Sequence, residues 1–262
     1  MRRERIGARR PIWAVSGVLP AVLMAACSAG GADPGSGDGL LRVVTTVSPI
    51  TNIVQNIGGP AVSIVGIVPE GANSHTFDPA PSDAAVMEQA DIVFLNGLGL
   101  EQPSLELAEA NVGADVPIVQ LADETIGPEE HIFDFSFPEP QGDPNPHLWT
   151  NPVYVRRYAE IVGRELSTLD PGNAGRFERN VDAFGERIDD LDQLVRDVTE
   201  TVPAPNRALL TYHDSFPYFA REYGWRIVGA VQPSDFSDPT PQEVTELIDQ
   251  IEAESIPAIF GS

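Results

Sequence analysis

The chain has 262 residues, 42% of them hydrophobic, and its 39 acidic and 16 basic side chains give a formal net charge of −23. This hydrophobic fraction suffices for folded cores, and about 220 residues of globular sequence suit two small lobes better than one large domain. The negative charge argues against nucleic acid and anionic lipid as partners and would concentrate divalent cations, although solubility alone explains most of these charges equally well.

Residues 1–26 are predicted to be a signal peptide. Five arginines among the first ten residues precede an apolar stretch, 11–26, that is too short for a comfortable membrane span. Small residues stand immediately before Cys27, the only cysteine of the chain, and this arrangement resembles a lipobox. Cys27 is therefore predicted to be lipidated, although Met24 stands where leucine is usual and a plain signal peptide is the alternative. Residues 27–39 then form the lipidated end and a flexible tether.

Residues 40–152 are predicted to form an N-terminal α/β lobe, because short apolar runs alternate with amphipathic patterns. Such a succession indicates a mainly parallel sheet with helices on both faces. The predicted strands are 41–47, 62–68, 91–96 and 117–121, and the predicted helices are 49–57, 82–90 and 103–110. Residues 122–145 follow as a long, acidic, proline-rich excursion around His131. This excursion is interpreted as a solvated loop, with metal capture as the alternative.

Residues 153–205 are predicted to be connecting helices. The first covers 154–166, and a second begins at Asp170, where an N-cap residue precedes a proline. Apolar side chains recur at alternating spacings of four and three from Phe177 to Val198, over fewer than four coiled-coil heptads. About 28 helical residues would make a rod roughly 42 Å long, enough to run the height of two stacked lobes.

Residues 206–262 are predicted to form a C-terminal α/β lobe. Its predicted elements are strands at 207–212, 226–231 and 256–260, a helix that starts directly after His213, and a helix at 241–254.

Three of the four histidines follow strand patterns, where open α/β sheets place their binding loops. His75 lies in a loop rich in Gly, Asn, Ser and Pro, and His213 ends a strand pattern. His147 follows Pro146 and precedes Trp149, so its segment is stiff and anchored by a large ring. Three neutral imidazoles suit Zn²⁺ or another first-row divalent ion, whereas Mg²⁺ and Ca²⁺ prefer oxygen ligands.

The segments HTFDP at 75–79, PHLWTNP at 146–152 and HDSFPYFAREYG at 213–224 resemble, in order and spacing, the ligand segments of a known family. This family comprises the zinc/manganese ABC transporter substrate-binding lipoproteins, of ZnuA/TroA-like type, some of which are called adhesins. The resemblance covers about residues 43–262. It implies an α/β fold of two lobes, each with a mainly parallel sheet flanked by helices, joined by one long rigid helix.

The same resemblance implies that His75, His147 and His213 are metal ligands. A histidine at the third position, here His213, leans toward zinc over manganese. Family members carry a further strand and helix, with an acidic fourth ligand, beyond the point that corresponds to residue 262. The second lobe is therefore expected to be incomplete, with the fourth ligand unassigned and water completing the tetrahedron.

The function implied is an extracytoplasmic receptor, anchored to the membrane through Cys27, that captures Zn²⁺ or Mn²⁺ between its lobes. It would act as a monomer without a catalytic cofactor and deliver the ion to an ABC permease. A three-His zinc hydrolase and a surface adhesin are the alternatives, but the sequence contains neither an HExxH helix nor a GxSxG elbow. Because imidazole binds metal only when deprotonated, affinity is expected to fall as the pH drops through about 6.5.

Overall fold

The computed structural model describes residues 39–232, 239–256 and 258–261. Cys27, the predicted signal peptide and nearly all of the predicted tether lie outside the described residues. No helix among the described residues is both long and apolar enough to cross a membrane.

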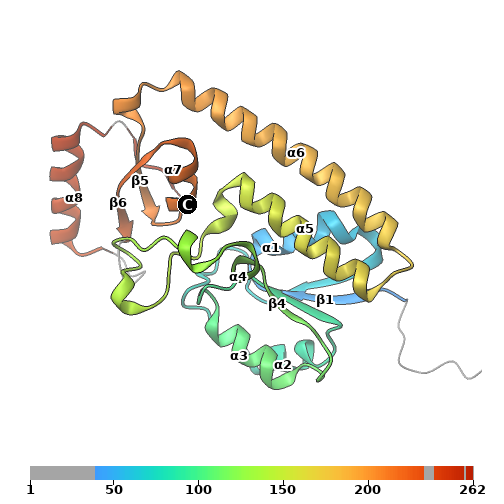
Figure 1. Cartoon of the computed structure of the whole chain (residues 1–262). Coiled ribbons are helices and arrows are strands. Elements are labelled where there is room, and N and C mark those ends of the chain that lie inside the picture. The colour runs from blue at the N-terminus through green and yellow to red at the C-terminus, as the bar shows by residue number, and fades with distance from the viewer. Residues whose placement is uncertain (1–38, 233–238, 257, 262) are drawn as a thin grey trace, which may run out of the picture. The chain divides into compact units, whose positions relative to one another are not determined.

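Four parallel strands form the first sheet, in the order β2-β1-β3-β4 (Figure 1). In chain order these strands are β1 (Leu41–Thr45), β2 (Val62–Gly66), β3 (Ile92–Leu95) and β4 (Ile118–Gln120). The helices connecting and following them are α1 (Ser48–Gly58), α2 (Pro81–Met87), α3 (Gln102–Asn111) and α4 (Leu121–Thr125). Every strand pair is parallel, as the alternating pattern predicts, and only α4 has no counterpart among the sequence-based elements.

A second sheet pairs β5 (Ala208–His213) with β6 (Arg226–Gln232), again in parallel and with a register shift between Leu209 and Leu210. Its helices are α7 (Pro217–Tyr223) and α8 (Pro241–Glu254). The helix predicted to start directly after His213 begins at Pro217, three residues late. The predicted strand at 256–260 is wrong for its described residues, because only Phe260 bridges to Thr211. Pro257 has no N–H to donate to a strand ladder.

Short 3₁₀ turns lie in the remaining connections, namely η1 (Gly59–Ala61), η2 (Pro128–Glu130), η3 (Glu139–Gln141), η4 (Leu148–Thr150) and η5 (Ala204–Asn206).

The long helix α6 (Ala174–Thr201) has 28 residues and follows α5 (Pro152–Leu169). It packs against α5 and α1 beside the first sheet and against α7 beside the second, so the predicted connector is confirmed (Figure 1). Near its end the Tyr223 hydroxyl donates to Asp192 at 2.7 Å, and Trp225 Nε1 donates to Thr199 Oγ1 at 3.1 Å. The predicted start at Asp170 is early, since that carboxylate instead accepts from Asn173 and closes the preceding turn.

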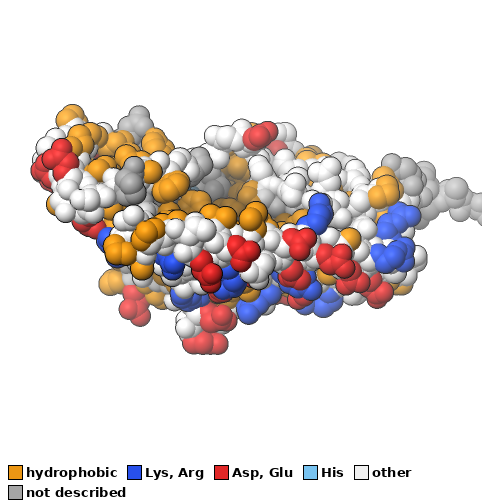
Figure 2. All heavy atoms as spheres, turned by 90° about the horizontal axis from the view of Figure 1, so that it is seen from above, with side chains coloured by type: hydrophobic (Ala, Val, Ile, Leu, Met, Phe, Trp, Pro, Cys, Tyr) orange, Lys and Arg blue, Asp and Glu red, His pale blue; other side chains and the backbone are white. Residues whose placement is uncertain are grey.

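The apolar stripe of α6 is buried only along its first half. Phe177 and Phe184 are buried against the first core, whereas Leu191, Leu194 and Val198 are 43–57% exposed. On the face viewed from the side of α6, acidic, arginine and apolar side chains are interspersed (Figure 2). The stripe reaches solvent where the helix leaves α5, because nothing in the described chain covers it there.

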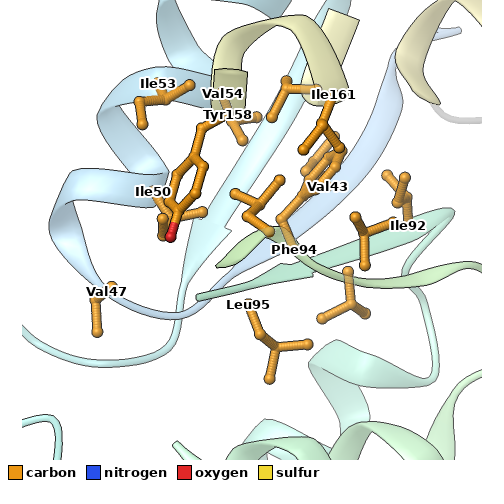
Figure 3. Packing of buried hydrophobic residues seen from close by; sticks show 14 of the residues in the cluster. Val43, Val47, Ile50, Ile53, Val54, Ile92, Phe94, Leu95, Tyr158 and Ile161 are labelled. Carbon is orange, nitrogen blue, oxygen red and sulfur yellow. The ribbon is translucent and has the colours of Figure 1, made fainter. Parts of the chain in front are cut away.

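The main hydrophobic core lies between the first sheet and helices α1 and α5 (Figure 3). Ile50 and Val54 of α1 and Tyr158 of α5 pack toward Val43 and Phe94 of the sheet, and each of these side chains is exposed by at most 1%. Burial of a side chain of this size contributes roughly 1.5–3 kcal/mol. This core fixes the strand ends from which the loops around the histidines emerge.

Close contact between α5 and α6 depends on Gly163. A Cβ atom there would lie 2.4 Å from Val181 Cγ2, whereas one at Gly175 would meet only Arg179 Nη1, at 3.5 Å. Gly163→Leu is expected to lower the free energy of unfolding by about 1–3 kcal/mol in urea titrations, because overpacking forces the helices apart. Gly175→Leu, the matched control, is expected to leave stability unchanged or raise it by up to about 1 kcal/mol. Equal losses in both variants would contradict this packing.

Candidate metal centre

The three predicted histidine ligands come from three segments of different stiffness. His75 lies in the loop between β2 and α2, where its backbone N–H donates to Asn73 Oδ1 at 3.0 Å. His147 immediately precedes η4 and is 2% exposed. His213 is the last residue of β5, so the second sheet sets its position directly.

The three Nε2 atoms point at one another. The separations are 3.0 Å between His75 and His147, 3.1 Å between His147 and His213, and 3.2 Å between His75 and His213. Nitrogen ligands 2.0–2.1 Å from a tetrahedral zinc ion would lie about 3.3 Å apart. The three nitrogens are therefore spaced closely enough for one ion to bind all of them.

These three histidines are the only group of ligating side chains of this kind among the described residues. His131 is half-buried and does not belong to it. The structure brings His75, His147 and His213 together, but it contains no ion, so their role as ligands stays a prediction.

Burial controls the charge of the three imidazoles. The pKa of His75 is lowered to about 3, mainly by desolvation and to a smaller extent by the neighbouring His213. Desolvation also lowers the pKa of His213 to about 4, although Asp134 opposes the shift. The pKa of His147 lies well below its ordinary value through burial, with smaller contributions from the other two histidines. All three rings are thus neutral near pH 7, the form that binds metal.

Aromatic rings surround the histidines on the protein side. Trp149 lies edge-on to His147, with ring centroids 5.0 Å apart, and Phe137 approaches both His75 and His147 within 5.9 Å. Phe137 belongs to the excursion 122–145, which the sequence predicts to be a solvated loop. That interpretation is wrong at Phe137 and Asn145, which pack against the histidines, whereas residues 139–143 are exposed as it expects.

A buried polar network holds the backbone next to His147. Asn96 Nδ2 donates to the Pro146 carbonyl at 2.9 Å, and Asn96 Oδ1 accepts from the Tyr158 hydroxyl at 2.9 Å. Glu101, 3% exposed, accepts from Thr46 Oγ1 at 2.6 Å and from the Asn96 backbone N–H at 2.7 Å. Burial raises the pKa of Glu101, and these hydrogen bonds partly offset that effect. The segment that carries His147 is therefore anchored to the core of the first sheet.

Two acidic residues near the histidines have different settings. Asp214 is fully buried, and burial followed by the nearby Asp134 raises its pKa to about 8. Asp78, in contrast, is exposed. Neither of them joins the group of ligating atoms.

On its solvent side the histidine cluster borders a cavity of about 590 Å³. Small and polar side chains line much of this cavity, among them Asn73, Ser74, Thr150, Ser215 and Gln232. An ion can therefore reach the three nitrogens from solvent without any rearrangement of the core.

Sequence reasoning missed Asn96, Glu101, Phe137 and Asn145 as residues of this site. Asn145 alone carries a local signal, since an Asn two residues before His147 can accept from the backbone N–H of that histidine. The other three come close to the cluster only through the packing of distant segments.

A neutral three-histidine cluster on an α/β scaffold with two parallel sheets and a connecting long helix is the arrangement expected of a metal-binding protein. A family model described as "Zinc-uptake complex component A periplasmic" matches residues 43–262, and the chain belongs to this ZnuA family.

Relatives within the curated proteins carry names of metal-binding proteins. The manganese-binding lipoprotein MntA of Halalkalibacterium halodurans is 28% identical over 246 residues, which are 93% of this chain and 78% of that protein. The iron-binding protein YfeA of Yersinia pestis is 30% identical over 220 residues, covering 84% of this chain and 68% of the relative. Among solved structures, the periplasmic zinc-binding protein TroA from Treponema pallidum aligns with a TM-score of 0.76 at 28% identity, covering 85% of this chain and 78% of TroA.

The depressed pKa values correct the expectation that the histidines titrate near pH 6.5. Between pH 6.5 and about 4 the unfolded chain binds protons at His75 and His213 that the folded protein does not. These histidines therefore contribute stability that is present above pH 6.5 and is lost as the pH falls toward 4. The contribution of Asp214 to stability changes with pH in the opposite direction. Its raised pKa contributes stability that is lost as the pH rises toward 8.

In metal-free protein, the free energy of unfolding is expected to fall less between pH 6.5 and 4.5 for His75→Ala than for wild type. The physical reason is that the variant's unfolded chain takes up one proton fewer over this range. Urea titrations at both pH values, in the presence of a chelator, measure the effect. His131→Ala is the matched control, and the prediction fails if His75→Ala and wild type lose the same stability.

Proposed function

We propose that this protein is the substrate-binding receptor of a metal ABC importer and that His75, His147 and His213 bind the transported ion. The observation that carries the proposal is the convergence of three Nε2 atoms within 3.2 Å of one another. Membership of the ZnuA family and the metal-binding names of the relatives support it.

Zinc is the proposed ion, with manganese as the runner-up. Three neutral nitrogen ligands suit Zn²⁺, and a given nitrogen site binds Zn²⁺ more tightly than Mn²⁺ in the usual order of divalent affinities. The names of relatives mention manganese, iron and zinc, so family membership alone does not select one ion.

The proposed location is the outer face of the cell membrane, with Cys27 as the lipid anchor. Relatives named lipoproteins support this assignment. The receptor would work as a monomer that hands its ion to a permease.

We also propose two lobes at 40–152 and 206–262 with connecting helices at 153–205. The strands of the first sheet fall within the first range and those of the second sheet within the last.

Each of the single variants His75→Ala, His147→Ala and His213→Ala is expected to weaken Zn²⁺ binding at least 10-fold at pH 7. Loss of an outer residue that merely orients a ligand already costs about 10-fold to 100-fold in metal affinity. Isothermal titration of the chain without residues 1–27 measures the affinity, and His131→Ala serves as the control. Unchanged affinity in any of the three variants would remove that residue from the site.

A zinc hydrolase with a three-His site is the alternative that the same protein sample can test. The metal-loaded protein is expected to show no hydrolysis of ester, amide or phosphate substrates above the rate with free Zn²⁺. One-to-one zinc binding without turnover supports the receptor. Turnover that disappears in His147→Ala would instead favour the enzyme.

A further inference from the structure

Asn145 makes contacts with three parts of the metal centre through one buried side chain. We propose that Asn145 is a positioning residue that selects the tautomer of His147 and ties this ligand to the segment carrying His213. This inference rests on the proposed function, since it concerns the same three histidines.

All hydrogen-bonding positions of the Asn145 amide face protein groups, and the residue is fully buried. Its Oδ1 lies 3.1 Å from the backbone N of His147 and 2.8 Å from His147 Nδ1. Its Nδ2 lies 3.0 Å from Asp134 Oδ2 and 3.0 Å from the Asp214 carbonyl oxygen. A buried amide with four partners has no freedom to turn without leaving several of them unpaired.

The orientation of this amide follows from the chemistry of its neighbours. The Asp214 carbonyl oxygen only accepts hydrogen bonds, so the NH₂ group of Asn145 must face it. The backbone N–H of His147 only donates, so it must face the carbonyl oxygen. The partners of the NH₂ group and those of the carbonyl oxygen therefore require the same orientation of the Asn145 amide. In this orientation the oxygen lies against His147 Nδ1.

An oxygen acceptor at 2.8 Å requires His147 to carry its proton on Nδ1. The lone pair of the neutral ring then lies on Nε2, the atom that meets the other two histidines. A ligand whose second nitrogen donates to a fixed acceptor has its tautomer and ring orientation set before the metal arrives. Asn145 thus prepares His147 for binding without touching the ion.

The donor end of Asn145 extends this effect to the second sheet. The Asp214 carbonyl belongs to the residue directly after His213, and β5 ends at His213. Asp134 also anchors the excursion, because its Oδ1 accepts from the backbone N–H groups of Ser136 and Phe137. Asn145 therefore fixes His147 relative to His213 and holds the ring of Phe137 near both His75 and His147.

Asn151 offers a matched comparison within the same segment. It is 1% exposed, its Nδ2 donates to the Tyr218 carbonyl at 3.2 Å, and its Oδ1 accepts from Val153 N–H at 2.9 Å. Its side chain thus joins the segment that carries His147 to α7, as Asn145 joins it to Asp214, but both of these hydrogen bonds are made with backbone groups and not with a histidine ring. If loss of the contacts between the His147 segment and the second sheet region were enough to weaken Zn²⁺ binding, Asn145→Ala and Asn151→Ala should therefore weaken it equally.

The first measurement is made on the wild-type protein. ¹⁵N NMR of metal-free protein labelled at histidine distinguishes protonated from unprotonated ring nitrogens, and assignment uses the missing resonances of His147→Ala. His147 is expected to be protonated at Nδ1 and unprotonated at Nε2 at pH 7. A proton on Nε2 of His147 would overturn the proposal regardless of how any variant folds.

The second measurement is Zn²⁺ titration calorimetry on Asn145→Ala and Asn151→Ala. Asn145→Ala is expected to lose about 10-fold to 100-fold in affinity, the usual effect of removing a group that orients a metal-bound histidine. Asn151→Ala is expected to stay within about threefold of wild type, because it leaves the histidine rings in place. In the His147→Ala background, the additional effect of Asn145→Ala should fall to threefold or less.

The outcomes separate this inference from the proposed function. If wild type binds no Zn²⁺, the receptor proposal fails. The inference fails if wild type binds Zn²⁺ but both asparagine variants lose affinity equally. It also fails if Asn145→Ala lowers the affinity as much in the His147→Ala background as in wild type. In either case Asn145 has only a structural role.

Discussion

Removal of three imidazoles from water, with their lone-pair nitrogens held 3.0–3.2 Å apart, is the constraint on which the rest of this structure depends. Protonation of one ring would place a positive charge in a poorly hydrated pocket beside two further imidazoles, and this lowers the pKa values. A divalent ion differs from a proton because it can accept all three lone pairs at once. The fold therefore disfavours protons at a place where it offers three ligands to a metal.

The scaffold supplies this constraint through elements of unequal rigidity. His147 is fixed from two sides, by the core network through Asn96 and by Asn145, and it lies against Trp149. His213 takes its position from the end of β5, while His75 lies on a loop that borders the open cavity. A rigid histidine, a sheet-bound histidine and a loop histidine together would give the proposed ion both a defined geometry and a path of entry.

The long helix α6 accounts for how two separate sheets can share one site. Its first half is locked onto α5 and α1 by buried aromatic side chains, and its last turns hold α7 and Trp225 by hydrogen bonds and by an ion pair between Arg196 and Glu222. Single contacts of the latter type are weak at a surface. The direct ties near the histidines, through Asn145 and Tyr218, therefore matter more for the relative placement of the three histidines.

The sequence by itself determined the parallel sheets and the long helix, because apolar periodicity, proline and turn residues act over a few neighbouring positions. It indicated the three histidine segments through their resemblance to a known family. It could not give the pKa values, and the expected titration near pH 6.5 was wrong because desolvation depends on which distant segments pack over each ring. The same holds for Phe137 and Asn145: the burial of one and the four hydrogen bonds of the other arise only when residues up to 69 positions apart come together. Tertiary structure alone decided which nitrogen atoms meet, since that choice depends on contacts that no local pattern encodes.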